Sequence, residues 1–97
     1  MNNSIVHKKV MALTEKMFLA TLPRALGSES YTWDGRQAVL ATDGRTFTIT
    51  FEAQDNFALG GFSVPRADVT LELNGYNDAE AEEAVARFER YFHRGGG

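Results

Sequence analysis

The stretch YTWDGRQAVLATDGRTFTITF, residues 31–51, contains two Asp-Gly pairs nine residues apart, Asp34-Gly35 and Asp43-Gly44. Asp-Gly is favoured at the centre of a two-residue β-hairpin turn because both central positions need positive φ. The residues around each pair are typical of β-strands. The stretch therefore predicts a three-stranded antiparallel meander with both of its turns defined.

The two predicted turns also define which side chains lie opposite one another. The first turn pairs Trp33 with Arg36, and the second pairs Leu40 with Phe47. Because paired residues point to the same side of a sheet, one face collects the bulky apolar residues. That face holds Tyr31, Trp33, Ala38, Leu40, Phe47, Ile49 and Phe51. The other face is rich in threonine, so we expect the apolar face to be buried.

Helical periodicity precedes the meander. Residues 5 to about 22 are predicted to form an amphipathic helix with Ser4 as its N-cap, and Pro23 and Gly27 mark its end. Its main apolar stripe comprises Val6, Val10, Leu13, Met17 and Ala20. A second, narrower stripe comprises Met11, Phe18 and Leu22. One sheet face need not cover both stripes, so the second stripe is a candidate for exposure.

Two more elements follow the meander. Residues 67–74 alternate apolar and polar side chains, which predicts another strand. Residues 78–93 carry an apolar helical stripe, and Asn77 and Glu80 have the spacing of a capping box. The segment between the meander and this strand, residues 54–66, is too apolar for an ordinary loop. It is either a hairpin around Gly60-Gly61 or an irregular arm over the edge of the core.

These elements predict an α+β domain. We expect a two-layer sandwich in which an antiparallel meander of about four strands carries an N-terminal and a C-terminal helix on one face. The 97 residues suit a single domain, with residues 1–3 and 95–97 frayed. The sequence has no cysteine and no long apolar run, so we expect a cytoplasmic protein without disulfides or a membrane span. Its pattern looks like that of many small bacterial or phage-encoded proteins.

Candidate catalytic and metal-binding groups are sparse. The two histidines, His7 and His93, each lack a second histidine at helical ligand spacing. The acidic residues at the start of the last predicted helix suit the positive end of its dipole; they are Asp78, Glu80, Glu82 and Glu83. We therefore predict no metal site, no cofactor and no catalytic group.

The leading hypothesis is a non-enzymatic protein-interaction module: an adaptor, an accessory subunit or an inhibitor. Its candidate interface combines the second stripe with the apolar segment and comprises Met11, Phe18, Leu22, Phe57, Leu59 and Phe62. We expect a protein partner or self-association, without direct nucleic-acid or membrane binding.

Two alternatives belong to other classes of function. The first is a small-molecule binder or minor enzyme with a pocket between sheet and helices, lined by Tyr31, Trp33, Arg36, Phe47 and Phe51. The second is an acidic mimic of nucleic acid, because the chain has a net charge of −3 and its acids cluster.

Overall fold

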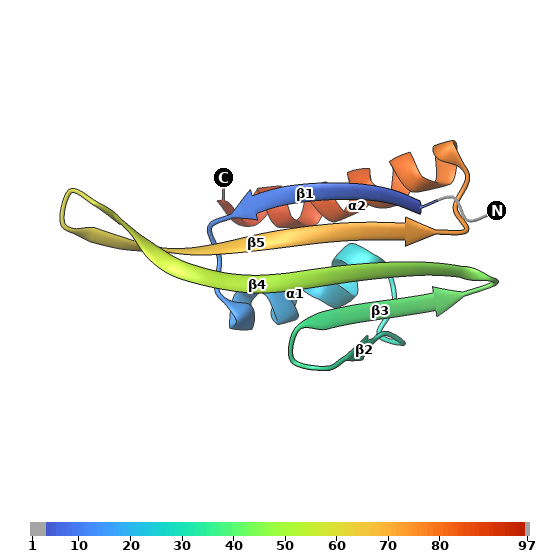
Figure 1. Ribbon diagram of the computed structural model, residues 1–97, viewed down its shortest axis with the longest axis horizontal. Helices are drawn as coiled ribbons and strands as arrows, with labels where there is room; N and C mark the ends of the chain where they lie inside the picture. The colour runs from blue at the N-terminus through green and yellow to red at the C-terminus, as the bar shows by residue number, and fades with distance from the viewer. Residues whose placement is uncertain (1–3, 97) are drawn as a thin grey trace.

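The computed structural model describes residues 4–96, without the side chains of Phe57, Leu59 and residues 93–96. This part of the chain forms one five-stranded antiparallel sheet and two helices (Figure 1). The strands are β1 (Ser4–Met11), β2 (Thr32–Trp33), β3 (Gln37–Thr42), β4 (Arg45–Leu59) and β5 (Phe62–Asn74), in the sheet order β1-β5-β4-β3-β2. The helices are α1 (Glu15–Leu26) and α2 (Asp78–Gly96). The predicted α+β class is confirmed, with five strands in place of about four.

The second Asp-Gly pair forms the predicted turn. Asp43 and Gly44 both have positive φ, 51° and 77°, as a tight two-residue turn requires. The register pairs Leu40 with Phe47, as expected from the sequence. Turn chemistry and side-chain alternation therefore agree along β3 and β4.

The first Asp-Gly pair forms a wider loop than predicted. Trp33 pairs with Ala38 rather than with Arg36, so four residues, 34–37, lie between the paired positions in place of two. The Asp34 carboxylate closes this loop: its Oδ1 accepts hydrogen bonds from the backbone N–H groups of Gln37 at 2.7 Å and Arg36 at 2.8 Å. These bonds lower the pKa of Asp34. The shift of two residues keeps every side chain on its predicted face, because strand alternation has a period of two.

The apolar face of the sheet is buried beneath both helices. Its fully buried members include Ala38, Ile49, Leu71 and Leu73, and Phe47 is only 3% exposed. The helices add further buried members of the same cluster, which are Phe18, Leu22, Ala25, Ala81, Val85 and Phe88. Within the described residues, no polar or charged side chain is buried. The core is therefore held by apolar packing.

The N-terminal segment differs from its prediction. Residues 5–11 belong to β1, which pairs antiparallel with β5, and the helix begins only at Glu15. The two residues of the predicted main stripe that fall in β1, Val6 and Val10, are 50% and 65% exposed. Apolar residues four apart fit a strand as well as a helix, because both positions lie on one side of a pleated strand. The β-branched residues of this segment favour the strand.

Helix α1 is defined by local capping. The hydroxyl of Thr14 accepts a hydrogen bond from the backbone N–H of Met17 at 3.2 Å, which caps the N-terminus. Gly27 ends the helix with a positive φ of 71°. Pro23 lies inside the helix rather than at its end. The N-cap of the helix, Thr14, therefore lies ten residues after the predicted cap at Ser4.

Helix α2 starts where the sequence predicts. Asn77 and Glu80 form a reciprocal capping box: the Asn77 N–H donates to Glu80 Oε1 at 3.1 Å, and the Glu80 N–H donates to Asn77 Oδ1 at 2.8 Å. Arg87 Nε donates to the backbone oxygen of Arg24 at 3.1 Å, which ties α2 to the end of α1. Neither helix of residues 4–96 has the length and apolar character needed to cross a membrane.

Candidate functional site

The predicted small-molecule pocket is filled by a side chain of α1. The ring of Phe18 lies 4.7 Å from that of Phe51 and 5.8 Å from that of Trp33, measured between centroids. Phe47 packs against Tyr76 instead, at 6.2 Å. Two of the predicted pocket residues, Phe47 and Phe51, are thus core residues, and Tyr31 and Trp33 are half-buried against the same core.

The polar group proposed for that pocket lies at its rim. The Arg36 guanidinium is 2.8 Å from Glu52, and its side chain is 65% exposed. An ion pair this exposed contributes little to stability. The structure therefore gathers the aromatic rings of the predicted pocket into the core and leaves its arginine at the surface.

The predicted interface is divided by the structure into two parts. Phe18 and Leu22 have no exposed surface and belong to the core, so they are not available to a partner. Met11 is half-buried at the end of β1, and Phe62 is 75% exposed at the start of β5. The side chains of Phe57 and Leu59 lie outside the described part of the structure. The exposed part of the prediction therefore comes from the strands rather than from α1.

The far ends of β4 and β5 form a protruding hairpin, which we call the arm (residues 54–66). Figure 1 shows it extending beyond both helices, and the molecule measures 49 × 22 × 22 Å. The length of β4 explains this shape: its 15 residues span about 50 Å, whereas the 19 residues of α2 span about 28 Å. Of the two alternatives for this segment, the hairpin with Gly60 and Gly61 at its turn is correct.

A β-bulge lies where the arm leaves the body. Gln54 pairs with Arg66 and Phe57 pairs with Val64, so two residues of β4 lie opposite Pro65 alone. A proline has no N–H to donate to the ladder, and a bulge removes the need for that donor. The bulge therefore allows β5 to carry a proline within its pairing with β4.

The base of the arm is hollow and apolar. A cavity of about 310 Å³ is lined by Val10, Met11, Ala12, Val64, Pro65 and Arg66. Val10 is 65% exposed beside it. The larger apolar side chains of this lining, together with the exposed Phe62 two residues before Val64 on β5, are called here the arm patch (Val10, Met11, Phe62, Val64 and Pro65).

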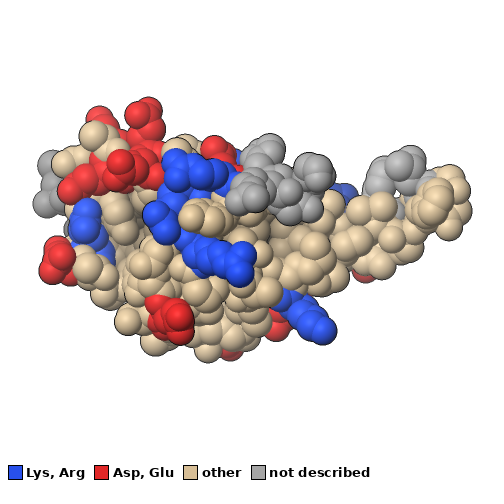
Figure 2. Space-filling view, turned by 180° about the vertical axis from the view of Figure 1, so that it is seen from behind, with Lys and Arg blue, Asp and Glu red and all other residues tan. Residues whose placement is uncertain are grey.

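The arm carries almost no charge. Asp55 is the one charged residue between Ala53 and Pro65. Figure 2 shows the same contrast: the coloured charges gather on the body, and the described part of the arm is mostly tan. Natural proteins commonly protect a projecting strand edge with charged residues, so an uncharged apolar arm is typical of an interface.

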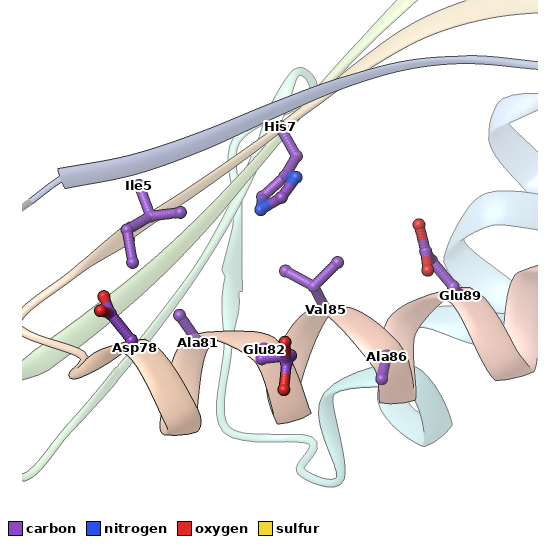
Figure 3. A pocket seen from close by; sticks show the side chains of 8 residues that line it. All are labelled: Ile5, His7, Asp78, Ala81, Glu82, Val85, Ala86 and Glu89. Atoms are coloured by element: carbon purple, nitrogen blue, oxygen red, sulfur yellow. The ribbon is translucent and has the colours of Figure 1, made fainter.

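A second hollow lies between β1 and α2 and is called here the β1–α2 groove. Its volume is about 350 Å³, and its lining residues are Ile5, His7, Asp78, Ala81, Glu82, Val85, Ala86 and Glu89. Figure 3 shows the side chains of Ile5 and His7 descending from β1 towards α2, with Ile5 above Asp78 and Ala81 and His7 above Val85. Lys9 of β1 forms an ion pair with Glu89 at one end of the groove. The floor is apolar and the α2 wall is acidic.

Ionisable groups elsewhere have structural surroundings. Burial raises the pKa of Tyr76, whose ring lies under the guanidinium of Arg45 at 5.0 Å. Among the described residues, no group of three or more histidine, aspartate or glutamate side chains is arranged to hold a metal ion. The arm patch and the β1–α2 groove are therefore the surfaces whose chemistry is most informative about function.

Sequence reasoning missed both Val10 and the β1–α2 groove. Both omissions follow from one error, because a helix over residues 5–22 leaves no edge strand beside α2. The alternation Ile5, His7, Lys9, Met11 on one face and Val6, Lys8, Val10 on the other carries the correct signal. A comparison with protein-family models, curated proteins and solved structures finds no match for this chain.

Proposed function

We propose that this protein is a non-enzymatic interaction module that binds a partner protein through its arm patch. The observation that carries the proposal is the exposure of Phe62, 75%, on a hairpin that extends beyond the helices. Large apolar residues that lie side by side on a surface mark binding sites. Val10, at 65% exposure, extends this surface onto the body.

The geometry of the arm supports insertion into a partner. A hairpin presents its two strands as a narrow ribbon, and the cavity of about 310 Å³ at its base accepts side chains from the partner in return. Aromatic anchors that enter a partner's pocket dominate the affinity of many interfaces. Phe62 is the described residue best placed for this role.

The proposal is tested with the partner itself. The tagged protein is purified from its native host, the co-eluting protein is identified, and the complex is rebuilt from the two purified chains. Burying one phenylalanine or valine contributes about 1.5–3 kcal/mol. We therefore expect F62S to weaken the reconstituted complex at least about tenfold and V10S to weaken it several-fold.

The matched control is V6S. Val6 lies on the same strand and the same face as Val10, is 50% exposed and does not line the cavity at the arm base. V6S should bind as the unchanged protein does. Equal affinity for F62S, V10S and V6S would exclude the arm patch as the interface. Sedimentation of the purified protein shows separately whether the partner is a second copy, because F62S would then disperse an oligomer.

A further inference from the structure

We infer that the β1–α2 groove binds an extended peptide segment that adds to the outer edge of β1 and carries apolar and basic side chains towards α2. This surface is separate from the arm patch, so the inference does not depend on the proposed function. Its three components are an edge strand, an apolar floor beside that strand and an acidic wall.

The edge strand provides backbone hydrogen-bonding groups. β1 is the outermost strand of the sheet and pairs with β5 over eight residues. Within residues 4–96, no strand pairs with the outer edge of β1. An edge of this kind binds an extended peptide by main-chain hydrogen bonds, and pockets for alternate side chains provide specificity.

The groove provides pockets on one side of the added strand. β1 turns Ile5, His7, Lys9 and Met11 towards the helical layer, because these residues pair with buried positions of β5. Ala81 and Val85 lie below them and are 3% and 7% exposed. Every second side chain of an added strand would point into the same layer. From Ile5 to Lys9 the strand spans about 13 Å, enough for two such side chains.

Charge selects the chemistry of the peptide. Asp78, Glu82 and Glu89 line the groove, and Lys9 neutralises Glu89. Among the described residues, neither Asp78 nor Glu82 forms an ion pair, so lysine or arginine in the peptide has partners at the wall. Apolar side chains between them would contact chiefly Ile5, because Ala81 and Val85 keep only 3% and 7% of their surface exposed.

A second copy of β1 is disfavoured as the occupant. Two copies related by a twofold axis would pair antiparallel, and Lys8 lies near the middle of β1. Lys8 of one copy would then face Lys8 or His7 of the other. Like charges directly opposite each other destabilise a strand pair, and lysine on an edge commonly prevents self-pairing.

The test uses a defined probe: a fluorescent nonapeptide, Thr-Lys-Thr-Val-Thr-Val-Thr-Lys-Thr, with blocked ends. Its Lys and Val side chains all lie on one side of an extended strand. A second peptide replaces both Lys with Glu. Fluorescence anisotropy should show binding of the lysine peptide and at least about tenfold weaker binding of the glutamate peptide. Binding of the glutamate peptide with equal or higher affinity would overturn the inference.

The protein offers a matched pair of variants for the acidic wall. Glu82 and Glu83 are adjacent on α2 and both exposed, but only Glu82 is a lining residue of the groove. E82K should weaken the lysine peptide about fivefold or more, and E83K should change its affinity less than about twofold. Equal losses in both variants would show attraction to the overall charge and would overturn the groove as the site.

Backbone pairing is tested with two N-methylated forms of the lysine peptide. Methylating alternate residues removes the donors from one edge of the strand, and methylating the other alternate set removes them from the opposite edge. One form should lose at least about tenfold in affinity while the other binds as the parent does. Two forms that bind equally, or no binding of the parent at millimolar concentration, would refute strand addition. F62S should bind the peptide normally, which separates this result from a failure of the arm proposal.

Discussion

The near and far halves of the β4–β5 ribbon have similar alternation but opposite surroundings. In the near half, Phe47, Ile49 and Phe51 lie against the helices with at most 4% of their surface exposed. In the far half, Phe62 is 75% exposed. The strands are continuous through both halves, so hairpin formation and burial are separate properties. Burial ends where the helices end, because about 28 Å of helix cannot cover about 50 Å of strand.

The largest expected effect on stability comes from removing the ring of Phe18, against which the near half of the ribbon packs. F18A should lower the free energy of unfolding by about 3–5 kcal/mol, because Phe18 is fully buried between Trp33 and Phe51. F62A, its counterpart on the arm, should change that free energy by less than about 0.5 kcal/mol. Urea denaturation of the two variants measures both values. Similar losses would mean that the arm is part of the core.

The protection of backbone amides against hydrogen exchange should differ between the near and far halves of the ribbon. Hydrogen-bonded amides of residues 47–51 should exchange only by global unfolding, whereas those of residues 57–64 should exchange by local opening of the arm. We expect a difference in protection of about a hundredfold or more. Uniform protection along β4, measured by NMR on the isolated protein, would contradict the separation of body and arm.

Gly75 and Gly60 lie at opposite ends of the β4–β5 ribbon, and substituting each of them compares the stability cost at the two ends. A Cβ at Gly75 would lie 2.7 Å from the backbone oxygen of Gly44, and Gly75 has a φ of +82°. G75A should therefore cost about 2 kcal/mol or more. Gly60 at the arm tip has a φ of +55° and open space around it, so G60A should cost only about 1 kcal/mol. Thermal denaturation of both variants gives the ranking, and a larger loss for G60A would contradict it.

The smallest expected effect on stability concerns Asp34, in the loop that connects β2 to β3. Hydrogen bonds from Gln37 and Arg36 hold the pKa of Asp34 below its ordinary value of 3.8 in the folded state. Asp34 therefore stabilises the fold above pH 3.8, and this contribution is lost as the pH falls through the lower folded-state pKa. Relative to D34N, the unchanged protein should lose stability on acidification. Parallel pH profiles of the two proteins would show that Asp34 does not close the loop.

Sequence reasoning succeeds where local chemistry and alternation agree. The turn at Asp43-Gly44, the capping box of Asn77 and Glu80, and the buried face of the meander are all present as predicted. Each depends on residues close together in sequence. The predicted strand register at the first turn differs from the observed register by two residues, because hydrogen bonds to the Asp34 side chain, rather than a two-residue Asp-Gly turn, organise the loop.

The prediction fails where tertiary pairing decides between two periodicities. Residues 5–11 fit a helix by spacing, yet the long β5 strand offers an edge that they pair with. Because the predicted helix begins too early, its main apolar stripe includes Val6 and Val10 of β1 and does not coincide with the buried face of α1. Met17, of the predicted main stripe, is 50% exposed, whereas Phe18 and Leu22, of the second stripe, form the core. Two of the six candidate interface residues, Phe18 and Leu22, are therefore core residues, whereas Phe62 is exposed.

Strand β5 continues from the body into the arm, and the side of the sheet on which its exposed residues lie sets the direction from which a proposed partner would approach. Ala67, Val69 and Leu71 face the helices, so Phe62 and Val64, at even positions, face the threonine side. The β1–α2 groove opens on the helical side and edge of the molecule. A protein held by the arm and a peptide held in the groove would thus approach from different directions. Under the two proposals made above, one copy of this chain would bridge two polypeptides at once.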